Sequence, residues 1–451
     1  MQLNAGPSND GPAAARSTAA VPGAGGSTLS SLRSRLHATA CLLLAAGMPA
    51  AARAESAPNW QFDGSALFYR ESGRVNVVEP IGRITRLFAD GSTASAQLSL
   101  DSITGATPNG NLPSGKGQTT TTPSGNVSTV SGGNIPVSSF KDFRGALDLD
   151  WSRPLAGFIT FDTGAHGSRE KDYSSTGISE KVALDLLHHR TNLSAGFGYN
   201  DDRVFPRGGT PLGTVDPLKV TTPLTTNPDP KRVRSGMLGL SEIVTRRWML
   251  AVNVTRTVEK GYLTEPYKVI SVLSPDNIED PNSGLPISAV TDCRPNSRDR
   301  RDVLTNSVYH LTDDILYLTH RYYWDDWGVK SHAVEVKYRH DLDEGGFLQP
   351  HVRLYTQTAA RFYTLAFIGQ APPPGTYATS DYRLGGLHSL TLGLTYGFGL
   401  GDYPGDFTLR GDYIRQWGNG YPANMTQAES QYDLFPPLNI LSLTLTYSVQ
   451  F

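Results

Sequence analysis

The last eleven residues constrain the fold of this chain more than any other stretch. In LSLTLTYSVQF, residues 441–451, apolar and polar residues alternate without a break. A period of two places alternate side chains on opposite faces of a β-strand. The stretch therefore predicts a two-sided strand, which fits a soluble sandwich as well as a transmembrane barrel.

The same alternation recurs through the chain, and several of the segments are long. It is clear in SLTLGLTYGFG (389–399), SHAVEVKYR (331–339), LSAGFGY (193–199) and ALDLDW (146–151). A tilted strand needs about 10 residues to cross the hydrocarbon of a bilayer. Outside the leader no stretch approaches the ~18 consecutive apolar residues of a membrane helix. Any crossing of a membrane is therefore expected to use strands.

The connections between these segments sort into short and long. An up-and-down outer-membrane barrel has tight periplasmic turns and long extracellular loops, whereas a sandwich has no reason for such sorting. Short exceptions on the long side occur at 71–74 and 325–328. The short turns are expected at 89–92, 152–155, 188–190, 245–247, 311–314, 341–346 and 401–406, and the long loops at 102–142, 166–177, 201–233, 259–301, 366–380 and 418–438.

We therefore predict an all-β fold: a transmembrane up-and-down antiparallel β-barrel of about sixteen strands, with both termini on the short-turn side. The final strand is expected to pair with the first, which removes both sheet edges. A terminal aromatic residue, Phe451, resembles the signal that barrel-assembly machinery reads. The expected strands are 60–70, 75–88, 93–101, 143–151, 156–165, 178–187, 191–200, 234–244, 247–258, 302–310, 315–324, 329–340, 347–365, 381–400, 407–417 and 439–451.

Residues 1–54 have the layout of a leader that ends in an export signal. Arg33 and Arg35 flank a short apolar run, ATACLLLAAGM, and small residues follow up to Ala54. We expect cleavage near Ala54, leaving residues 55–451 as a single barrel domain. Cys41 lies near the start of the apolar run, not at its end as in a lipoprotein. Cys293 is then the only cysteine left, so no disulfide can form within one mature chain.

Four stretches carry a resemblance to a known family. They are DSITGATPNG (101–110), GYLTEPYKVISV (261–272), HRYYWDDWGVKSHAVEVKYRH (320–340) and LYTQTAARFY (354–363). They resemble an uncharacterised family of bacterial exported proteins, domain of unknown function 3570, over almost the whole mature chain. The family has no established activity or site residues to transfer. The resemblance implies a redox setting outside the cytoplasm.

Several motifs have both a chemical and a structural interpretation. His188 and His189 lie at a tight turn, and adjacent strand residues point to opposite faces, so a metal site of three or four ligands is not expected there. The pairs 313–314 and 325–326 are Asp-Asp, which suits calcium binding, but Asp also stabilises turns through its own side chain.

The aromatic and loop motifs also have both a chemical and a structural interpretation. The residues Tyr322, Tyr323, Trp324 and Trp327 fit an interfacial aromatic girdle. The loop DSITGATPNG could grip an anion through backbone N–H groups, but it lacks the lysine of a phosphate-binding loop; we expect the foot of a shaped outer loop. His320 and His332 are on the apolar faces of their strands, which favours the girdle over a hydrolase, and the chain has no G-x-S-x-G motif.

The polar faces of the predicted strands carry charges of both signs. A charged group facing lipid costs about 2–4 kcal/mol at the bilayer midplane, so these residues are expected to point inward. Mixed charge suits a wet pore and equally a lumen joined by ion pairs. The expected lumen-lining residues are Asp148, Asp150, Asp162, Asp185, Arg321, Glu335, Lys337, Arg339, His351, Arg353, Arg410 and Asp412.

These features predict an outer-membrane protein of a Gram-negative bacterium that is a porin-like channel for small solutes. The alternative is a barrel scaffold for a periplasmic or surface partner, for example a redox protein or flavoprotein; a third hypothesis is an outer-membrane lipid hydrolase. Beyond the outer-membrane lipid and the barrel-assembly machinery, the sequence names no partner. The net charge of −2 gives no reason to expect nucleic acid binding. We expect no enzymatic activity, no metal and no cofactor.

Overall fold

The computed structural model of the protein describes residues 59–451, except for 122–126, 207–208, 212, 215–227, 276–283, 343–344 and 400–403. The predicted leader, 1–54, and its cleavage near Ala54 lie outside the described residues. No helix in the described part of the chain is long and apolar enough to cross a membrane.

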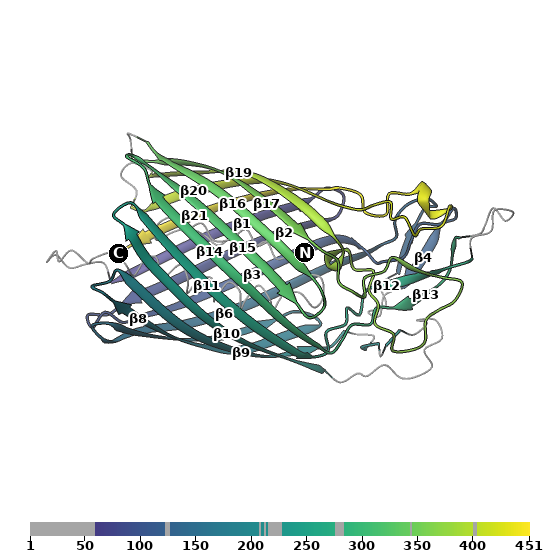
Figure 1. Cartoon of the computed structure of the whole chain (residues 1–451), viewed down its shortest axis with the longest axis horizontal. Helices are drawn as coiled ribbons and strands as arrows, with labels where there is room; N and C mark the ends of the chain where they lie inside the picture. Colours follow the sequence, from purple (N-terminus) through teal and green to yellow (C-terminus); the bar gives the residue numbers. More distant parts are fainter. Residues whose placement is uncertain are drawn as a thin grey trace.

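Sixteen antiparallel strands form a closed barrel, which confirms the predicted fold class and strand number (Figure 1). Each barrel strand pairs with the barrel strands that precede and follow it in the sequence, so the topology is up-and-down. The barrel strands are β1 (Trp60–Glu71), β2 (Val75–Leu87), β3 (Thr93–Pro108), β6 (Val137–Ala156), β7 (Ile159–Arg169), β8 (Tyr173–Leu186), β9 (Thr191–Val204), β10 (Asp229–Thr245), β11 (Trp248–Gly261), β14 (Ser297–His310), β15 (Asp314–Asp325), β16 (Lys330–Asp341), β17 (Phe347–Gln357), β19 (Leu387–Gly399), β20 (Asp406–Gly418) and β21 (Leu438–Gln450).

The first and last strands close the barrel, as predicted. Gln61 lies opposite Gln450, and the register continues without a break to Glu71 opposite Ile440. The backbone N–H of Trp60 donates to Phe451 O at 3.0 Å, and Phe451 N–H donates to Trp60 O at 2.9 Å. No barrel edge is left to pair with another chain, because the ends of the sheet satisfy each other.

The exposed face of the barrel is the apolar one. In β21, Leu441, Leu443 and Leu445 are 60%, 45% and 43% exposed, whereas the alternating residues Thr444 and Thr446 are each 3% exposed. A soluble sandwich would bury the leucines and expose the threonines. The pattern repeats around the barrel, with Phe68, Leu147, Leu238 and Leu354 on the outside. A belt of exposed aliphatic side chains is what a lipid bilayer solvates, so this outer face is the membrane-facing one.

Aromatic side chains border this belt at the short-turn end. The row runs from Tyr396 and Phe398 on β19 to Phe407 on β20 and Tyr447 on β21. Successive ring centroids are 5.0, 5.7 and 4.8 Å apart. The Tyr447 hydroxyl donates to Pro404 O at 2.7 Å. An apolar ring with a polar tip suits the membrane–water interface.

A second aromatic group borders the belt at the other end. The rings of Tyr322 and Trp324 are 5.2 Å apart, and His332 lies 4.6 Å from Tyr322. Residues Tyr323 and Trp327, which we placed in the girdle, are instead buried on the inner side. Tyr323 faces inward because its strand neighbours Tyr322 and Trp324 both face outward, and three consecutive aromatic residues conceal this period. Trp327 lies in the turn after β15, where the two-residue period does not apply.

The short and long connections alternate as predicted in most places, but several boundaries and one loop differ. The expected turn 152–155 lies within β6, which continues to Ala156, and β14 begins at Ser297 instead of 302. The expected loop 166–177 is a tight turn, because β7 and β8 continue to Arg169 and Tyr173. The expected strand 347–365 ends at Gln357, and 381–400 begins at Leu387. The side chain of Gln357 donates to the carbonyl oxygens of Arg383 and Gly385, both at 2.9 Å, which fixes the chain in a loop between these strands.

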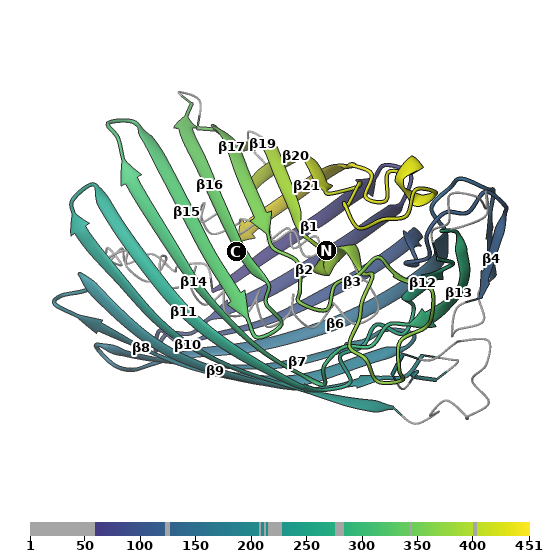
Figure 2. The same cartoon turned by 45° about the vertical axis from the view of Figure 1, so that its right-hand side comes forward.

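The long connections fold into a separate layer at one end of the barrel, opposite the C-terminus (Figures 1 and 2). Its centre is a three-stranded sheet of β13 (Pro286–Thr291), β12 (Val269–Leu273) and β18 (Ala366–Ile368), packed around Ile270, Val272, Val290 and Ala378. We call this sheet, with the described residues of 262–296 and 358–386, the cap. The layer also contains the hairpin β4 (Gln118–Thr121) and β5 (Val127–Val130), and the short helices η2 (Tyr382–Leu384) and η3 (Glu429–Gln431).

Candidate channel interior and extracellular cap

One sector of the inner wall carries a continuous charged network. The strand register places Lys337 opposite His351, His351 opposite Gly393, and Gly393 opposite Asp412. His351 Nε2 lies 2.9 Å from Asp412 Oδ1, and Arg410 Nε donates to Asp412 Oδ2 at 2.9 Å. Gly393 leaves the space that the His351 ring occupies, because a Cβ at position 393 would lie 2.1 Å from that ring.

The next row of the same wall is also paired. Glu335 lies opposite Arg353 on the neighbouring strand, and Lys337 Nζ lies 3.8 Å from Glu335 Oε2. Opposite charges in adjacent rows compensate one another, so the wall presents both signs at short range. The sequence predicted the positions of Glu335 and Lys337, because strict alternation in SHAVEVKYR separates the charged face from the valines.

A second charged sector lies on β6, β7 and β8. The Asp148 carboxylate lies 2.7 Å from His166 Nδ1, and Lys181 Nζ lies 2.6 Å from Asp162 Oδ2. Asp150 shares the inner face, since its neighbours Leu149 and Trp151 are exposed outside. Asp185, nearer the short turns, accepts a hydrogen bond from Asn192 Nδ2 at 2.5 Å.

The remaining predicted residues are Arg321 and Arg339. Arg321 donates to Asp302 Oδ1 at 2.7 Å on the inner face of β14 and β15. Arg339 lies at the short-turn end, where it pairs with Asp341 at 2.8 Å and covers the Phe347 ring. The structure therefore places all twelve predicted residues on the inner face, in separate paired groups rather than in one constellation.

Sequence reasoning missed several buried pairs on this face, among them Lys231 with Asp202. Arg300 on β14 pairs with Glu259 on β11 at 2.7 Å, and both side chains are buried. We began the expected strand at 302, so Arg300 fell in a loop. The alternation in SRDRRDV, which sets Arg298, Arg300 and Asp302 against exposed Arg301, was the signal that could have extended the strand.

Toward the cap, one sector of the inner wall changes from polar to apolar. Tyr69, Val77, Ile414 and Ile440 form a buried cluster there with further apolar residues of β1, β2, β3, β19, β20 and β21. Phe435, from the β20–β21 connection, packs against it, and its ring meets Tyr382 of η2 edge-on at 5.8 Å. Loop segments therefore lie against the inner wall and narrow this end of the barrel.

The cap is held together by a buried ionic network. Arg294 pairs with Asp292 at 3.0 Å and with Asp381 at 2.9 Å. Arg383 pairs with Asp381 at 2.6 Å and with Glu265 at 3.0 Å. These pairs join the β11–β14 connection to the β17–β19 connection, which are distant in the sequence. The network links the two loops specifically, because a buried charge that loses its partner is strongly destabilising.

The electrostatics of the network follow from its burial and its neighbours. Burial alone would raise the pKa of Asp381, but the guanidinium groups of Arg383 and Arg294 outweigh burial and hold that pKa well below its usual value. Burial lowers the pKa of Lys268 to about 8, and burial raises the pKa of Tyr382 to about 12. Lys268 lies over the Tyr382 ring, 5.5 Å from its centroid.

The stretch DSITGATPNG attaches the barrel to the cap. It is the end of β3 and the first residues after it, as expected for the foot of an outer loop. Val269 N–H donates to Asn109 O at 2.9 Å, and Leu112 N–H donates to the Ser271 hydroxyl at 2.9 Å. Gly110 has φ of 101°, and a Cβ there would lie 2.1 Å from Val269 O. The glycine is required because the cap strand passes directly over it.

A small open cleft remains between the cap and the barrel wall. Its lining comes from four connections between barrel strands and includes Arg74, Asn111, Tyr363, Tyr382 and Phe435. Arg74 lies 5.5 Å from the centroid of the Tyr382 ring. The cleft is mainly apolar and aromatic, with one cationic group at its side.

Asp325 and Asp314, from the two Asp-Asp pairs considered for calcium binding or turn formation, make contacts within the protein. Asp325 Oδ1 accepts from Val329 N–H at 2.9 Å within its turn, and Asp325 Oδ2 accepts from Arg298 and Tyr323. Asp314 lies 2.7 Å from His340 Nδ1.

The histidines considered for chemistry form two separate pairs. His320 and His332 are 3.3 Å apart on the outer face, beside the aromatic group. His188 and His189 lie in the β8–β9 turn with positive φ, and His189 is 3.6 Å from Asp185.

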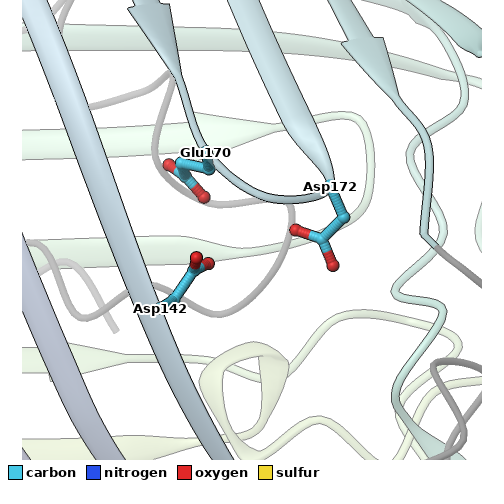
Figure 3. A group of neighbouring side chains, drawn as sticks. All are labelled: Asp142, Glu170 and Asp172. Carbon is cyan, nitrogen blue, oxygen red and sulfur yellow. The ribbon is translucent and has the colours of Figure 1, made fainter.

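A different acidic group does converge at the cap end of the barrel. Asp142 of β6 and Glu170 and Asp172 of the β7–β8 turn bring carboxylate oxygens within 4.8 Å of one another (Figure 3). The three could offer oxygen ligands to a divalent cation. Each also has a contact within the protein. Phe143 N–H donates to Asp142, Arg144 lies 3.9 Å from Glu170, and the Tyr267 hydroxyl donates to Asp172.

The family described as "Protein of unknown function (DUF3570)" matches residues 33–449. The chain belongs to this family. The match confirms the resemblance inferred from the four sequence stretches, and it covers every strand of the DUF3570 barrel. No curated protein matches the sequence.

Solved structures similar to the DUF3570 barrel include outer-membrane proteins. OpdK of Pseudomonas aeruginosa is 9% identical, with 87% of this chain and 98% of that chain covered and a TM-score of 0.39. A bacterial polysaccharide outer-membrane secretin is 8% identical, with 88% and 100% covered and a TM-score of 0.44. The siderophore receptor PirA of Pseudomonas aeruginosa is 8% identical and has a TM-score of 0.39; the match covers 80% of this chain and 57% of PirA.

The DUF3570 chain is a closed barrel of sixteen antiparallel strands with an aliphatic outer face, which is the architecture of an outer-membrane β-barrel. Such barrels occur in the outer membranes of Gram-negative bacteria.

Proposed function

We propose that the DUF3570 barrel is a channel for small hydrophilic solutes, and that it is not an enzyme. The observation that carries this proposal is the charged inner wall, which has paired groups of both signs on β16–β20 and again on β6–β8. A dry inner face stabilised by apolar packing would not be expected to carry so many charges, because burying a charge away from water is costly. A barrel of sixteen strands is wide enough to enclose an aqueous path.

The proposed solute path is narrowed at the cap end. Phe435 and the residues of η2 lie on the apolar sector of the wall, and the cap is linked to the barrel through Gly110. Mixed charge along the path favours small zwitterionic or neutral polar solutes over strongly charged ones, because each sign is met by its opposite nearby.

Single-channel recording in planar bilayers tests this function. We expect stepwise conductance for the folded barrel, with cation selectivity lowered in Glu335→Gln and raised in Arg353→Gln, because each removes one sign from the inner wall. Arg415→Gln is the matched control, since Arg415 is exposed on the outer face of β20 and should leave selectivity unchanged. A folded barrel without conductance would refute the channel.

The second candidate is a scaffold for a protein partner at the cell surface. One observation favours it: Val127, Ile287, Tyr377 and Tyr421 are large apolar side chains exposed on the loops, away from the membrane-facing belt. Exposed apolar residues outside the bilayer are typical of interaction surfaces. Co-purification of one surface or periplasmic protein with a non-conducting barrel would favour the scaffold.

We further propose that the protein is exported with cleavage of the leader near Ala54 and is inserted by the barrel-assembly machinery. N-terminal sequencing of the protein from outer membranes tests the cleavage. A mature N-terminus well before Arg33 would contradict the leader assignment.

A further inference from the structure

The outer face of the barrel has a basic patch directly above the membrane-facing belt. It lies at the cap end of β9, β10, β11 and β14, where six basic side chains point outward. Two acidic side chains, Asp201 and Asp299, share this face, so the patch has an excess of four positive charges. Its basic members are Arg203, Arg232, Arg234, Arg256, Lys260 and Arg301.

The strand register fixes the height of the patch relative to the belt. Leu238, Val254 and Val303 lie side by side and form an aliphatic row of the belt on these strands, and Val258 lies further toward the cap, opposite Arg234. One step further toward the cap, Arg256 lies opposite Arg301. A further step or two brings Arg234, then Arg232 opposite Lys260. The change from aliphatic to basic occurs within about 7 Å, the rise of two strand residues.

The acidic residues do not neutralise the patch. Asp299 accepts hydrogen bonds from both Arg256 and Arg301, each at 2.9 Å, so one carboxylate is shared by two guanidinium groups. Asp201 lies opposite Arg232 but pairs with Arg203, at 3.5 Å. Arg234 and Lys260 form no ion pair with any residue that the structure describes. The side chains of Arg256 and Arg301 are 64% and 47% exposed even with their partner in place.

From this placement we infer that the patch binds the phosphate groups of a phosphorylated glycolipid of the outer leaflet. A bilayer lipid whose acyl chains lie along Leu238, Val254 and Val303 has its headgroup at the height of Arg256, Arg301 and Arg234. Guanidinium groups match phosphate oxygens in bidentate geometry, and lysine adds a point charge. Continuity with the belt identifies a lipid as the occupant, because a soluble protein would have to enter the headgroup layer to reach the lower row.

The neighbouring aromatic group supports the same depth. In the register, Arg301 lies opposite Trp324, and Trp324 lies opposite Lys330. The basic row therefore continues into the interfacial ring of Trp324, Tyr322 and His332, which marks the headgroup level independently.

The experiment compares a patch variant with a control on the same hairpin. The patch variant is Arg232→Gln, Arg234→Gln and Lys260→Gln, which leaves the Arg256–Asp299–Arg301 group intact. The control is Arg246→Gln with Arg247→Gln, at the opposite end of the β10–β11 hairpin, where both side chains are exposed. Both are refolded in detergent with a chelator present, and heat-modifiable mobility verifies that each barrel is folded.

The refolded proteins are titrated with bisphosphorylated lipid A, with the same lipid after removal of its phosphates, and with inorganic phosphate. We expect the patch variant to bind the phosphorylated lipid roughly ten- to a hundredfold more weakly than the wild type, since each basic residue near an anionic surface contributes about 1 kcal/mol. The control should bind like the wild type, and higher salt should weaken binding.

Three results would overturn the inference. The patch variant binding as tightly as the wild type would show that the patch is not the site. Equal binding of the dephosphorylated lipid would show that phosphate is not recognised. Inorganic phosphate binding as tightly as the lipid would assign the patch to a free anion.

Discussion

At the residue scale, Gly110 illustrates how closely the cap approaches the barrel. Its backbone is left-handed, and a Cβ at this position would lie 2.1 Å from both Ser380 Oγ and Val269 O, so there is no room for a side chain. Two independent loops are fixed at this one point, because Ser380 and Val269 belong to different connections. Cys293, buried in the same cap and hydrogen-bonded through its backbone to Ala378 at 2.9 Å, offers a way to measure cap opening.

We predict that Gly110→Val separates the cap from the barrel while the barrel itself stays folded. Strained backbone and overlap together should cost about 2 kcal/mol or more of cap stability. The measurement is the rate at which a thiol reagent modifies Cys293, with heat-modifiable mobility as the test of barrel folding. Gly115→Val is the matched control, because nothing lies within 4 Å of a Cβ at that position. Equal labelling rates for the two variants would contradict this role of Gly110.

At the scale of elements, the terminal strand has two functions in one sequence. Its polar face lies toward the interior, its leucines face lipid, and its backbone closes the barrel against β1. Phe451 follows the last residue of the strand and is 62% exposed, so its ring contributes little to packing. An exposed aromatic residue at this position suits recognition during assembly better than it suits stability of the finished barrel.

Replacing that ring should therefore affect assembly and not export. We predict that Phe451→Ser lowers the amount of barrel in the outer membrane several-fold and leaves the amount reaching the periplasm unchanged. The backbone hydrogen bonds to Trp60 remain possible in the variant. Immunoblotting of separated membrane and periplasmic fractions measures both quantities. Normal outer-membrane yield would mean that the terminal aromatic residue is dispensable.

At the scale of the whole molecule, the two ends of the barrel differ in what they present. Tight turns lie at one end, and the cap lies at the other (Figure 2). The stacked aromatic row around Phe398 borders the first end, and the aromatic group around Trp324 and the basic patch border the second. Long loops of outer-membrane barrels are extracellular, so this asymmetry sets the orientation.

An inserted epitope tests that orientation. A tag placed beside Gly115, in the long β3–β6 connection, should be labelled by antibody on intact cells. The same tag between Arg246 and Arg247, in the β10–β11 turn, should be labelled only after the outer membrane is opened. The reverse pattern would invert the barrel and move the basic patch to the periplasmic leaflet.

The sequence alone determined the barrel, because strand periodicity is a local property that survives in a single segment. Alternation in residues 441–451 and 331–339 identified which side chains face inward, and the sorting of connections identified the number of strands. The inward placement of Glu335, Arg353 and Asp412 followed from the same two-residue period, since lipid excludes charge. Errors of sidedness arose at Tyr323, which lies within three consecutive aromatic residues, and at Trp327, which lies in the turn after β15.

Only the tertiary structure decided how the loops fold and which charges meet. Nothing in the local sequence relates Asp292 to Asp381, or Gly110 to Val269, because loop contacts depend on the order of strands around the barrel and not on any period. The same is true of the basic patch. Arg234, Arg256 and Arg301 come from three strands, and only the register brings them to one height above the membrane-facing belt.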